Sequence, residues 1–347
     1  MTERANNFDL LRLVAAGSVI FSHSFLLSEG HQNNEPLVAM TGQAVFGLLG
    51  VFVFFTISGF LVTQSYDNTR STARFILKRF LRIYPGLAAC MIFCALVIGA
   101  LVSTLPLRDY YAQPGVYRFV AMNLAMVVQA NALPSVLFTA FSGLGDIVDG
   151  PLWSLPFELA MYGMVAILGL LGWLRNGFIA FLWLLGVGCA LYDTTQWHDV
   201  PWNFAGGFLW LLGFFTAGMA MYRFRGPWLY DRRLALAAIA GIVVSAPLHE
   251  LIALFAVFGS FLTIHFALDP RYPAIPAARF GDLSYGLYIY GWPVEQTILW
   301  AFGGKLPWWQ LFVAALPATA LLAFISWHVV EKSALRLKPR AAQQKIA

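Results

Sequence analysis

Two polar side chains, Arg12 and His23, interrupt the hydrophobic segment FDLLRLVAAGSVIFSHSF at residues 8–25. They lie eleven residues apart, about three helical turns, so they share nearly one face and are separated by roughly 16 Å along the axis. A charged guanidinium is costly inside a membrane helix and usually marks a functional path. The pair predicts a site for an extended ligand that is anionic near Arg12 and reacts near His23. The alternative is structural: Arg12 reaches the membrane surface, and His23 is a hydrogen-bonded core residue.

A carboxylate on another segment could complete this chemistry. Glu158 lies in PLWSLPFELAMY, residues 151–162, about one and a half turns into a predicted spanning helix. An intramembrane carboxylate is expensive and is a functional candidate. We expect Glu158 and His23 in the outer halves of their helices, where Glu158 could orient His23 or itself act as a general base. A structural ion pair is the alternative.

A basic run, RSTARFILKRFLRIYP, occupies residues 70–85. It carries five cationic side chains at helical spacing: Arg70, Arg74, Lys78, Arg79 and Arg82. The pattern predicts a basic amphipathic helix along the cytoplasmic face, with Arg79 and Arg82 at the mouth of the bundle. Arginine pairs well with phosphate oxygens, so this helix could bind a phosphorylated ligand. Anchoring to lipid by positive charge is the alternative.

Two further motifs each allow two interpretations. Ser58-Gly59 interrupts the bulky segment 50–62, which indicates either close helix packing or a place where a ligand approaches the backbone. The segment GDLSYGLYIYGWPVEQT at 281–297 is rich in Tyr and Trp. Such rings form an aromatic belt at a membrane interface, and they could equally stack on a carbohydrate.

The composition determines the class of protein. The chain has 347 residues, of which 59% are hydrophobic and 11% charged, whereas soluble domains carry roughly 25% charge. This is typical of a polytopic membrane protein. The three cysteines lie in apolar runs without metal-ligand spacing, so we expect no metal site, and a net charge of +5 does not indicate a nucleic-acid partner.

Ten hydrophobic segments are long enough, at about 17–25 residues, to be considered as spans, although two of them are short. We expect them near residues 8–28, 44–65, 83–104, 152–174, 177–192, 203–222, 234–248, 251–268, 283–302 and 309–331. The fold class is therefore all-α, a polytopic membrane helical bundle of about ten transmembrane helices. A partly apolar stretch at 117–129 is too short to span and is expected to be an interfacial or re-entrant helix.

The charge distribution predicts the orientation. With the N-terminus in the cytoplasm, all but four of the 22 Lys and Arg residues fall on the inner side. The four are Arg12 within the first span and Arg108, Arg118 and Lys305 outside. This is a strong positive-inside pattern, so we expect both termini in the cytoplasm. Residues 1–333 form one transmembrane domain, and 334–347 form a short basic tail near anionic lipid headgroups.

The order of six motifs gives a family resemblance. The motifs are Arg12 with His23, SGF at 58–60, KRFLRIYP at 78–85, PLWSLPFE at 151–158, SYGLYIYGWPV at 284–294 and VVEK at 329–332. The chain thereby resembles the acyltransferase-3 family, integral-membrane O-acyltransferases of bacteria, over about residues 6–333. The resemblance implies transfer of an acyl group, commonly acetyl from cytoplasmic acetyl-CoA, to a hydroxyl of a cell-surface polysaccharide or its lipid-linked precursor. One departure is Gly291, where many relatives have His before Trp-Pro.

The resemblance also implies roles for residues. His23 and Arg12 match the family's catalytic pair, and Arg79 and Arg82 match its arginine motif. We expect the phosphates of coenzyme A to dock on these arginines and neighbouring groups, and Arg12 to neutralise the pyrophosphate or polarise the thioester. The expected donor-binding residues are Arg79, Arg82, Arg12, Lys78, Ser58 and Gly59.

The acceptor side and the mechanism are less constrained. His23 acts as general base on the acceptor hydroxyl or carries the acyl group covalently, with Glu158 holding the imidazole tautomer. The expected acceptor-binding residues are Trp153, Tyr285, Tyr288 and Trp292. Acyl-CoA is a substrate rather than a resident cofactor, and the expected location is the bacterial inner membrane. The alternative function is a transporter of a lipid-linked sugar or anionic metabolite, which predicts internal repeats and paired broken helices; the sequence has neither.

Overall fold

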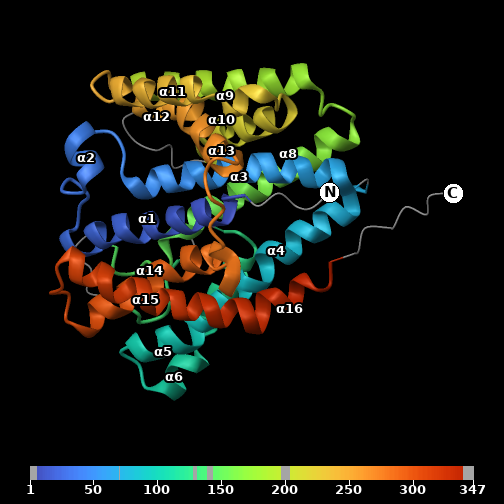
Figure 1. The fold of residues 1–347 in the computed structure, drawn as a ribbon. Helices are drawn as coiled ribbons and strands as arrows, with labels where there is room; N and C mark the ends of the chain where they lie inside the picture. Colours follow the sequence, from blue (N-terminus) through green and yellow to red (C-terminus); the bar gives the residue numbers. More distant parts are fainter. Residues whose placement is uncertain (1–5, 70, 128–130, 139–143, 197–203, 339–347) are drawn as a thin grey trace.

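The part of the chain that the structure, a computed structural model, describes is built from helices and turns without a strand. It comprises residues 6–69, 71–127, 131–138, 144–196 and 204–338. Each of the ten expected spans falls on a helix or on a continuous run of helices (Figure 1). The main helices are α1 (Phe8–Glu29), α3 (Phe46–Thr69), α4 (Thr72–Phe93), α8 (Leu155–Leu170), α9 (Asn176–Gln196), α10 (Phe204–Arg223), α11 (Arg232–Ser245), α13 (Ser260–Leu268), α14 (Ser284–Ala301) and α15 (Trp308–Ser326).

Short helices extend or connect these. Three π-helical turns join consecutive α-helices: η1 (Cys94–Ile98) links α4 to α5 (Gly99–Val102), η4 (Phe255–Gly259) links α12 (Leu251–Leu254) to α13, and η6 (Trp327–Glu331) links α15 to α16 (Lys332–Leu335). The connecting elements are α2 (Pro36–Thr41), α6 (Leu107–Ala112), α7 (Pro114–Leu124), η2 (Gly150–Ser154), η3 (Pro227–Tyr230) and η5 (Ala277–Phe280). Helix α7 covers most of the predicted interfacial segment.

Among the described residues, six helical segments are long and apolar enough, by length and composition, to cross a membrane. They are Phe8–Glu29, Phe46–Thr69, Thr72–Val102, Gly150–Leu170, Leu251–Leu268 and Trp308–Leu335. Segments of this kind are typical of a multi-pass membrane protein.

Helix α1 occupies the centre of the bundle. It lies between α3 on one side and α14 with α15 on the other, while α9 to α13 and α4 to α6 form the two flanks (Figure 1). Arginines of α1 and α4 meet at one end of the bundle, which we call the basic end. The described C-terminal residue, Lys338, lies at the same end: burial, together with nearby Arg79, Arg82 and Lys78, lowers its pKa to about 8.

The basic run and the third span form one helix, which corrects the expectation of a separate surface helix. Helix α4 begins after Ser71, whose side-chain oxygen accepts from the Arg74 amide, and it continues through Pro85. Proline is tolerated inside a membrane helix because neighbouring helices can compensate for the lost backbone bond. As a result, Arg79 and Arg82 lie on the first turns of a spanning helix.

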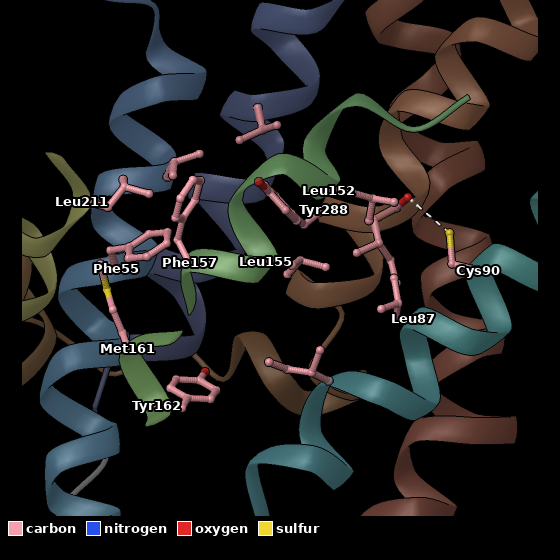
Figure 2. Packing of buried hydrophobic residues seen from close by; sticks show 14 of the residues in the cluster. Phe55, Leu87, Cys90, Leu152, Leu155, Phe157, Met161, Tyr162, Leu211 and Tyr288 are labelled. Atoms are coloured by element: carbon pink, nitrogen blue, oxygen red, sulfur yellow. Dashed lines mark hydrogen bonds between the residues drawn. The ribbon is translucent and has the colours of Figure 1, made fainter. Parts of the chain in front are cut away.

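The segment before α8 is buried rather than exposed at the membrane surface. Asp149, Pro151 and Leu152 are all buried, and Leu152 and Leu155 pack near Leu87 of α4 and Tyr288 of α14 (Figure 2). The chain therefore enters the bundle as a loop and a 3-10 turn, and α8 starts only at Leu155. The residues of α8 therefore lie further toward the basic end than they would in a helix that begins at the membrane surface.

Glycine allows α3 and α10 to cross closely. A Cβ atom at Gly59 would overlap the carbonyl oxygen of Phe215, and one at Gly218 would overlap that of Thr56. Small residues at such crossings let two membrane helices approach to backbone contact. Gly59 therefore serves helix packing, the first of its two interpretations.

This packing predicts that Gly59→Ala lowers the free energy of unfolding by about 1–3 kcal/mol, because the added methyl group meets fixed backbone atoms. Thermal unfolding of the purified protein in detergent measures the effect. Gly163→Ala is the matched control, since a Cβ there has nothing within 4 Å. Unchanged stability together with weaker donor binding in Gly59→Ala would favour the ligand interpretation instead.

Candidate active site

A polar cavity of about 80 Å³ lies at the basic end of the bundle. Its walls bring together most of the predicted donor-side residues from helices far apart in the sequence. The polar lining comprises Arg12, Ser58, Arg79, Arg82, Ser154, Glu158, Tyr162, Ser284, Tyr285 and Tyr288. Three arginines and one carboxylate, that of Glu158, thus line one cavity of the bundle.

Asp282 bridges two of these arginines. Its Oδ2 accepts a hydrogen bond of 2.6 Å from Nη2 of Arg82 and lies 3.8 Å from Nη1 of Arg12. The hydroxyl of Ser284 donates to the other oxygen at 2.6 Å. Burial raises the pKa of the Asp282 carboxyl, but Arg82 and Arg12 outweigh it and hold the pKa at about 2. Asp282 is therefore ionised and orients two guanidinium groups at the cavity.

Arg79 is held differently. Its Nη2 donates to Oγ of Ser65 at 3.3 Å, and its guanidinium lies over the ring of Tyr162, 5.7 Å from the centroid. Within the described part of the chain it forms no ion pair, and its Nε has no hydrogen-bond partner. Arg79 is thus the arginine of this cavity whose charge is not matched by a carboxylate.

Glu158 does not lie beside His23, which corrects that expectation. Its Oε1 accepts hydrogen bonds from Ser58, at 2.8 Å, and from the hydroxyl of Tyr162. The physical reason is the buried turn η2: α8 begins only after it, inside the bundle, and this displaces Glu158 toward the basic end. Glu158 consequently faces the cavity that also contains Arg79 and Arg82.

The carboxylate beside His23 belongs to Glu295 of α14. His23 Nδ1 lies 3.8 Å from Oε2 of Glu295, whose side chain is fully buried. The other oxygen, Oε1, accepts from the hydroxyl of Ser24 at 2.7 Å. Neither His23 Nδ1 nor Glu295 Oε2 has a hydrogen-bond partner among the described residues. A separation of 3.8 Å exceeds a hydrogen bond, but catalytic contacts are often long in unliganded sites and shorten on binding.

Trp292 packs against His23. The two rings meet edge to face, with centroids 4.9 Å apart, and the indole N–H donates to the carbonyl of Ile147 at 3.0 Å. One turn further along α14, Gln296 donates to the carbonyl of Leu144 at 3.0 Å. The loop that precedes η2 is thereby fastened against the helix that carries Glu295.

Five predicted residues lie outside the cavity lining: Lys78, Gly59, Trp153, His23 and Trp292. Lys78 donates to the hydroxyl of Thr69 at 3.0 Å, and Gly59 packs against α10. Trp153 lies against Phe157, with ring centroids 6.0 Å apart. Tyr285 and Tyr288, predicted for the acceptor side, line the cavity at the basic end together with the arginines.

Two contacts show that α1 and α14 run side by side in the same direction. Arg12 meets Asp282 just before α14 begins, and His23 meets Glu295 further along it. Arg12 and His23 are eleven positions apart, and Asp282 and Glu295 are thirteen positions apart, so the two pairs lie about three helical turns from each other. The site therefore has two levels, one cationic and one with an imidazole and a carboxylate.

The sequence analysis missed Asp282 and Glu295. The rule that selected Glu158, a carboxylate in an expected span, applies equally to Glu295. Helical spacing was a second indication that Glu295 belongs to the site. It follows Trp292, a predicted acceptor-binding residue, by three residues and so lies on the same face of the helix. Asp282 lies directly before a span, where an acidic side chain is inexpensive, so no rule singled it out.

Comparison with known proteins identifies the family. A family model described as an acyltransferase domain, that of acyltransferase-3, matches residues 6–328. "Nodulation protein 10" of Rhizobium leguminosarum bv. viciae is 30% identical, over 99% of this chain and 96% of the relative. An "O-acetyl transferase" of Shigella phage Sf6 is 27% identical, over 95% of this chain and 96% of the relative. No solved structure matches significantly.

The match extends over nearly the whole described bundle and includes both levels of the site. The apolar helices and the family together make the protein a multi-pass membrane protein. The chain therefore belongs to the acyltransferase-3 family and is a membrane O-acyltransferase.

Proposed function

We propose that this enzyme transfers an acetyl group from acetyl-CoA to a hydroxyl of a cell-surface polysaccharide or of its lipid-linked precursor. The observation that carries the proposal is the two-level site along α1, with arginines at one level and the His23–Glu295 pair at the other. The relative named an O-acetyl transferase supports acetyl as the group. A transporter has no comparable support.

The donor is proposed to bind at the basic end. The diphosphate of coenzyme A lies against Arg79 and Arg82, because guanidinium groups pair with phosphate oxygens through charge-assisted bonds. Arg12, which lines the same cavity, neutralises the remaining charge. The pantetheine arm extends past Tyr285 and Tyr288 toward His23, so we assign these tyrosines to the donor. Since the cavity measures about 80 Å³, side chains must move aside to admit the arm.

His23 is proposed as the general base. It removes the proton from the acceptor hydroxyl, whose oxygen attacks the carbonyl carbon of the thioester. The carbon–sulfur bond then breaks, and the departing thiolate takes up the proton from the imidazolium. Trp292, which packs edge to face on the imidazole, forms the acceptor side of the site.

Glu295 is proposed to position His23. Its carboxylate lies opposite Nδ1 and would accept a hydrogen bond from the N–H group there, which leaves Nε2 as the base and stabilises the imidazolium that forms. Ser24 holds the other carboxylate oxygen and so fixes the orientation of Glu295. Glu158, bound by Ser58 and Tyr162, is proposed to balance the charge of the donor-side arginines.

The arrangement in the membrane follows from the charge pattern. We propose ten spans in the bacterial inner membrane with the basic end in the cytoplasm, because nearly all Lys and Arg residues then lie inside. Reporter domains inserted after Lys332 and within residues 105–127 are expected on opposite sides of the membrane. Signals from the same side would contradict this topology.

His23→Ala is expected to abolish acetylation while the protein remains in the membrane. Loss of a general base lowers the rate per molecule by about 10²–10⁴. Glu295→Gln keeps the size of the side chain but not its charge, and we expect at least about a tenfold loss. The measurement is the mass increment of one acetyl group on surface glycan, with the amount of enzyme determined in parallel.

His328→Ala is the matched control, since His328 is an exposed histidine in another helical run and its loss should leave acetylation unchanged. Wild-type activity per molecule in His23→Ala would overturn the mechanism. Glycans that are identical with and without the gene would overturn the proposed acceptor class.

Arg79→Ala is expected to raise the KM for acetyl-CoA roughly 10- to 150-fold, the equivalent of one charge-assisted bond to phosphate. Stability should change little, because Arg79 has no ion pair to lose within the described chain. Membranes assayed over a range of acetyl-CoA concentrations provide the measurement. Arg74→Ala, an exposed arginine on the same helix, is the control, and an equal KM in both variants would remove Arg79 from the donor site.

A further inference from the structure

A second cavity lies on the far side of α10 from the site. It has a volume of about 400 Å³ and is formed by α9, α10, η3, α11, η4 and α13. None of its lining residues lines the first cavity. Its size falls within the ~300–1,000 Å³ typical of pockets for small organic molecules, so it can hold a ligand of its own.

The walls of this cavity are apolar and open toward the surroundings of the bundle. Met221, Ala238 and Phe261 are buried in its interior, whereas Phe224 and Leu234 at its edge are 41% and 45% exposed. None of the described residues that line it carries a charge. Because these helices belong to a membrane protein, the medium at the open edge is lipid, and the matching occupant is a hydrocarbon chain.

The cavity has a cationic rim at one end. Arg233 precedes Leu234 directly and Ala237 by four residues, and both of these line the cavity, so Arg233 lies on the same stripe of α11, one turn nearer its start. Arg232 and Arg233 are both exposed. Neither forms an ion pair within the described part of the chain. These two guanidinium groups are therefore free to bind an anion just beyond the apolar space.

The other charged groups near the rim are already engaged. Asp231 accepts from the backbone N–H of Arg233 at 2.7 Å and thereby caps α11. Arg225 lies over the ring of Tyr222, 4.3 Å from the centroid, and donates to the carbonyl of the same residue at 2.6 Å. Arg271, which donates to the carbonyl of Tyr230 in η3, is paired with Asp269. With Arg225, Arg232 and Arg233 against Asp231, the rim is positive.

One polar atom of the lining is unused. Nε1 of Trp183 is buried and has no hydrogen-bond partner among the described residues, whereas Nε1 of Trp228 donates to the carbonyl of Phe224 at 2.7 Å. A buried N–H without a partner is costly. A ligand that carries an acceptor oxygen next to its hydrocarbon part would satisfy it.

We propose that this cavity binds an anionic phospholipid of the surrounding membrane. One acyl chain lies between α10 and α11, an ester oxygen accepts from Trp183, and the headgroup phosphate contacts Arg233 and Arg232. The site is independent of acyl transfer, since it shares no residue with the active site. The cavity lies among helices α9 to α13, which form one flank of the bundle and pack against α3 through α10 and α13. A lipid bound there would stabilise the packing of that flank.

Native mass spectrometry of the purified enzyme tests the proposal. Phosphatidylglycerol and phosphatidylcholine with identical acyl chains are the probes. We expect phosphatidylglycerol to bind more tightly than phosphatidylcholine. Arg233→Gln should lower the affinity for phosphatidylglycerol roughly fivefold, as expected for one basic residue near an anionic headgroup. The affinity for phosphatidylcholine should not change. Arg336→Gln, which changes an exposed arginine elsewhere at the basic end, should behave as wild type.

Two further variants address the apolar part. Trp183→Phe preserves the aromatic wall but removes the indole N–H, and it should weaken the binding of both lipids equally. Ala238→Phe fills the cavity and should abolish the binding of both, while Ala314→Phe on the exposed face of α15 should not; retained acetylation shows that each variant is folded.

Three outcomes would overturn the proposal. The first is equal binding of the two lipids with no effect of Arg233→Gln. The second is lipid binding that survives Ala238→Phe. The third is a dimer that Ala238→Phe dissociates in the absence of lipid, which would make the cavity an interface between two copies of the chain.

Discussion

The bundle depends on how it accommodates guanidinium groups within its membrane helices. An uncompensated charge there is expensive, and Asp282 compensates two arginines at once through one oxygen, with Ser284 holding the other. This contact ties α1, α4 and the start of α14 together at a single level. Because α1 and α14 are then rigid and parallel, the level at which His23 meets Glu295 follows from the same contact.

The separation of the two levels makes chemical sense for a transferase with substrates of opposite character. The proposed polyanionic donor needs cations and access from water, whereas an imidazole that acts as a general base must be unprotonated when the acceptor binds. Three helical turns of α1 provide that separation. The buried loop before α8 lies between the levels, because it is hydrogen-bonded to Tyr288 through Pro151 and to Trp292 through Ile147.

The sequence predicted the helices well because hydrophobic length and charge are local properties. Every expected span corresponds to a helical run, and Arg12, Arg79 and Arg82 do converge on one cavity. The continuity of α4 through Pro85 was not predictable, since it depends on neighbouring helices that compensate for the missing N–H. The prediction that Glu158 lies beside His23 was wrong for a similar reason. Glu158 and Glu295 are both carboxylates inside expected spans, and only the buried position of η2, which the sequence does not show, distinguishes them.

Gly291, where the family resemblance led us to expect a histidine, lies beside the His23–Glu295 pair on α14. A Cβ at Gly291 would lie 2.9 Å from Cγ1 of Ile20, so α14 approaches α1 more closely here than a larger residue allows. Glu295 follows Gly291 by one turn, as Ser24 follows Ile20, so the close approach is what brings Glu295 within 2.7 Å of the Ser24 hydroxyl and beside His23. A histidine at 291 would require a wider gap between the helices. The glycine at position 291 therefore allows the close approach of α14 to α1 one turn from the His23–Glu295 pair.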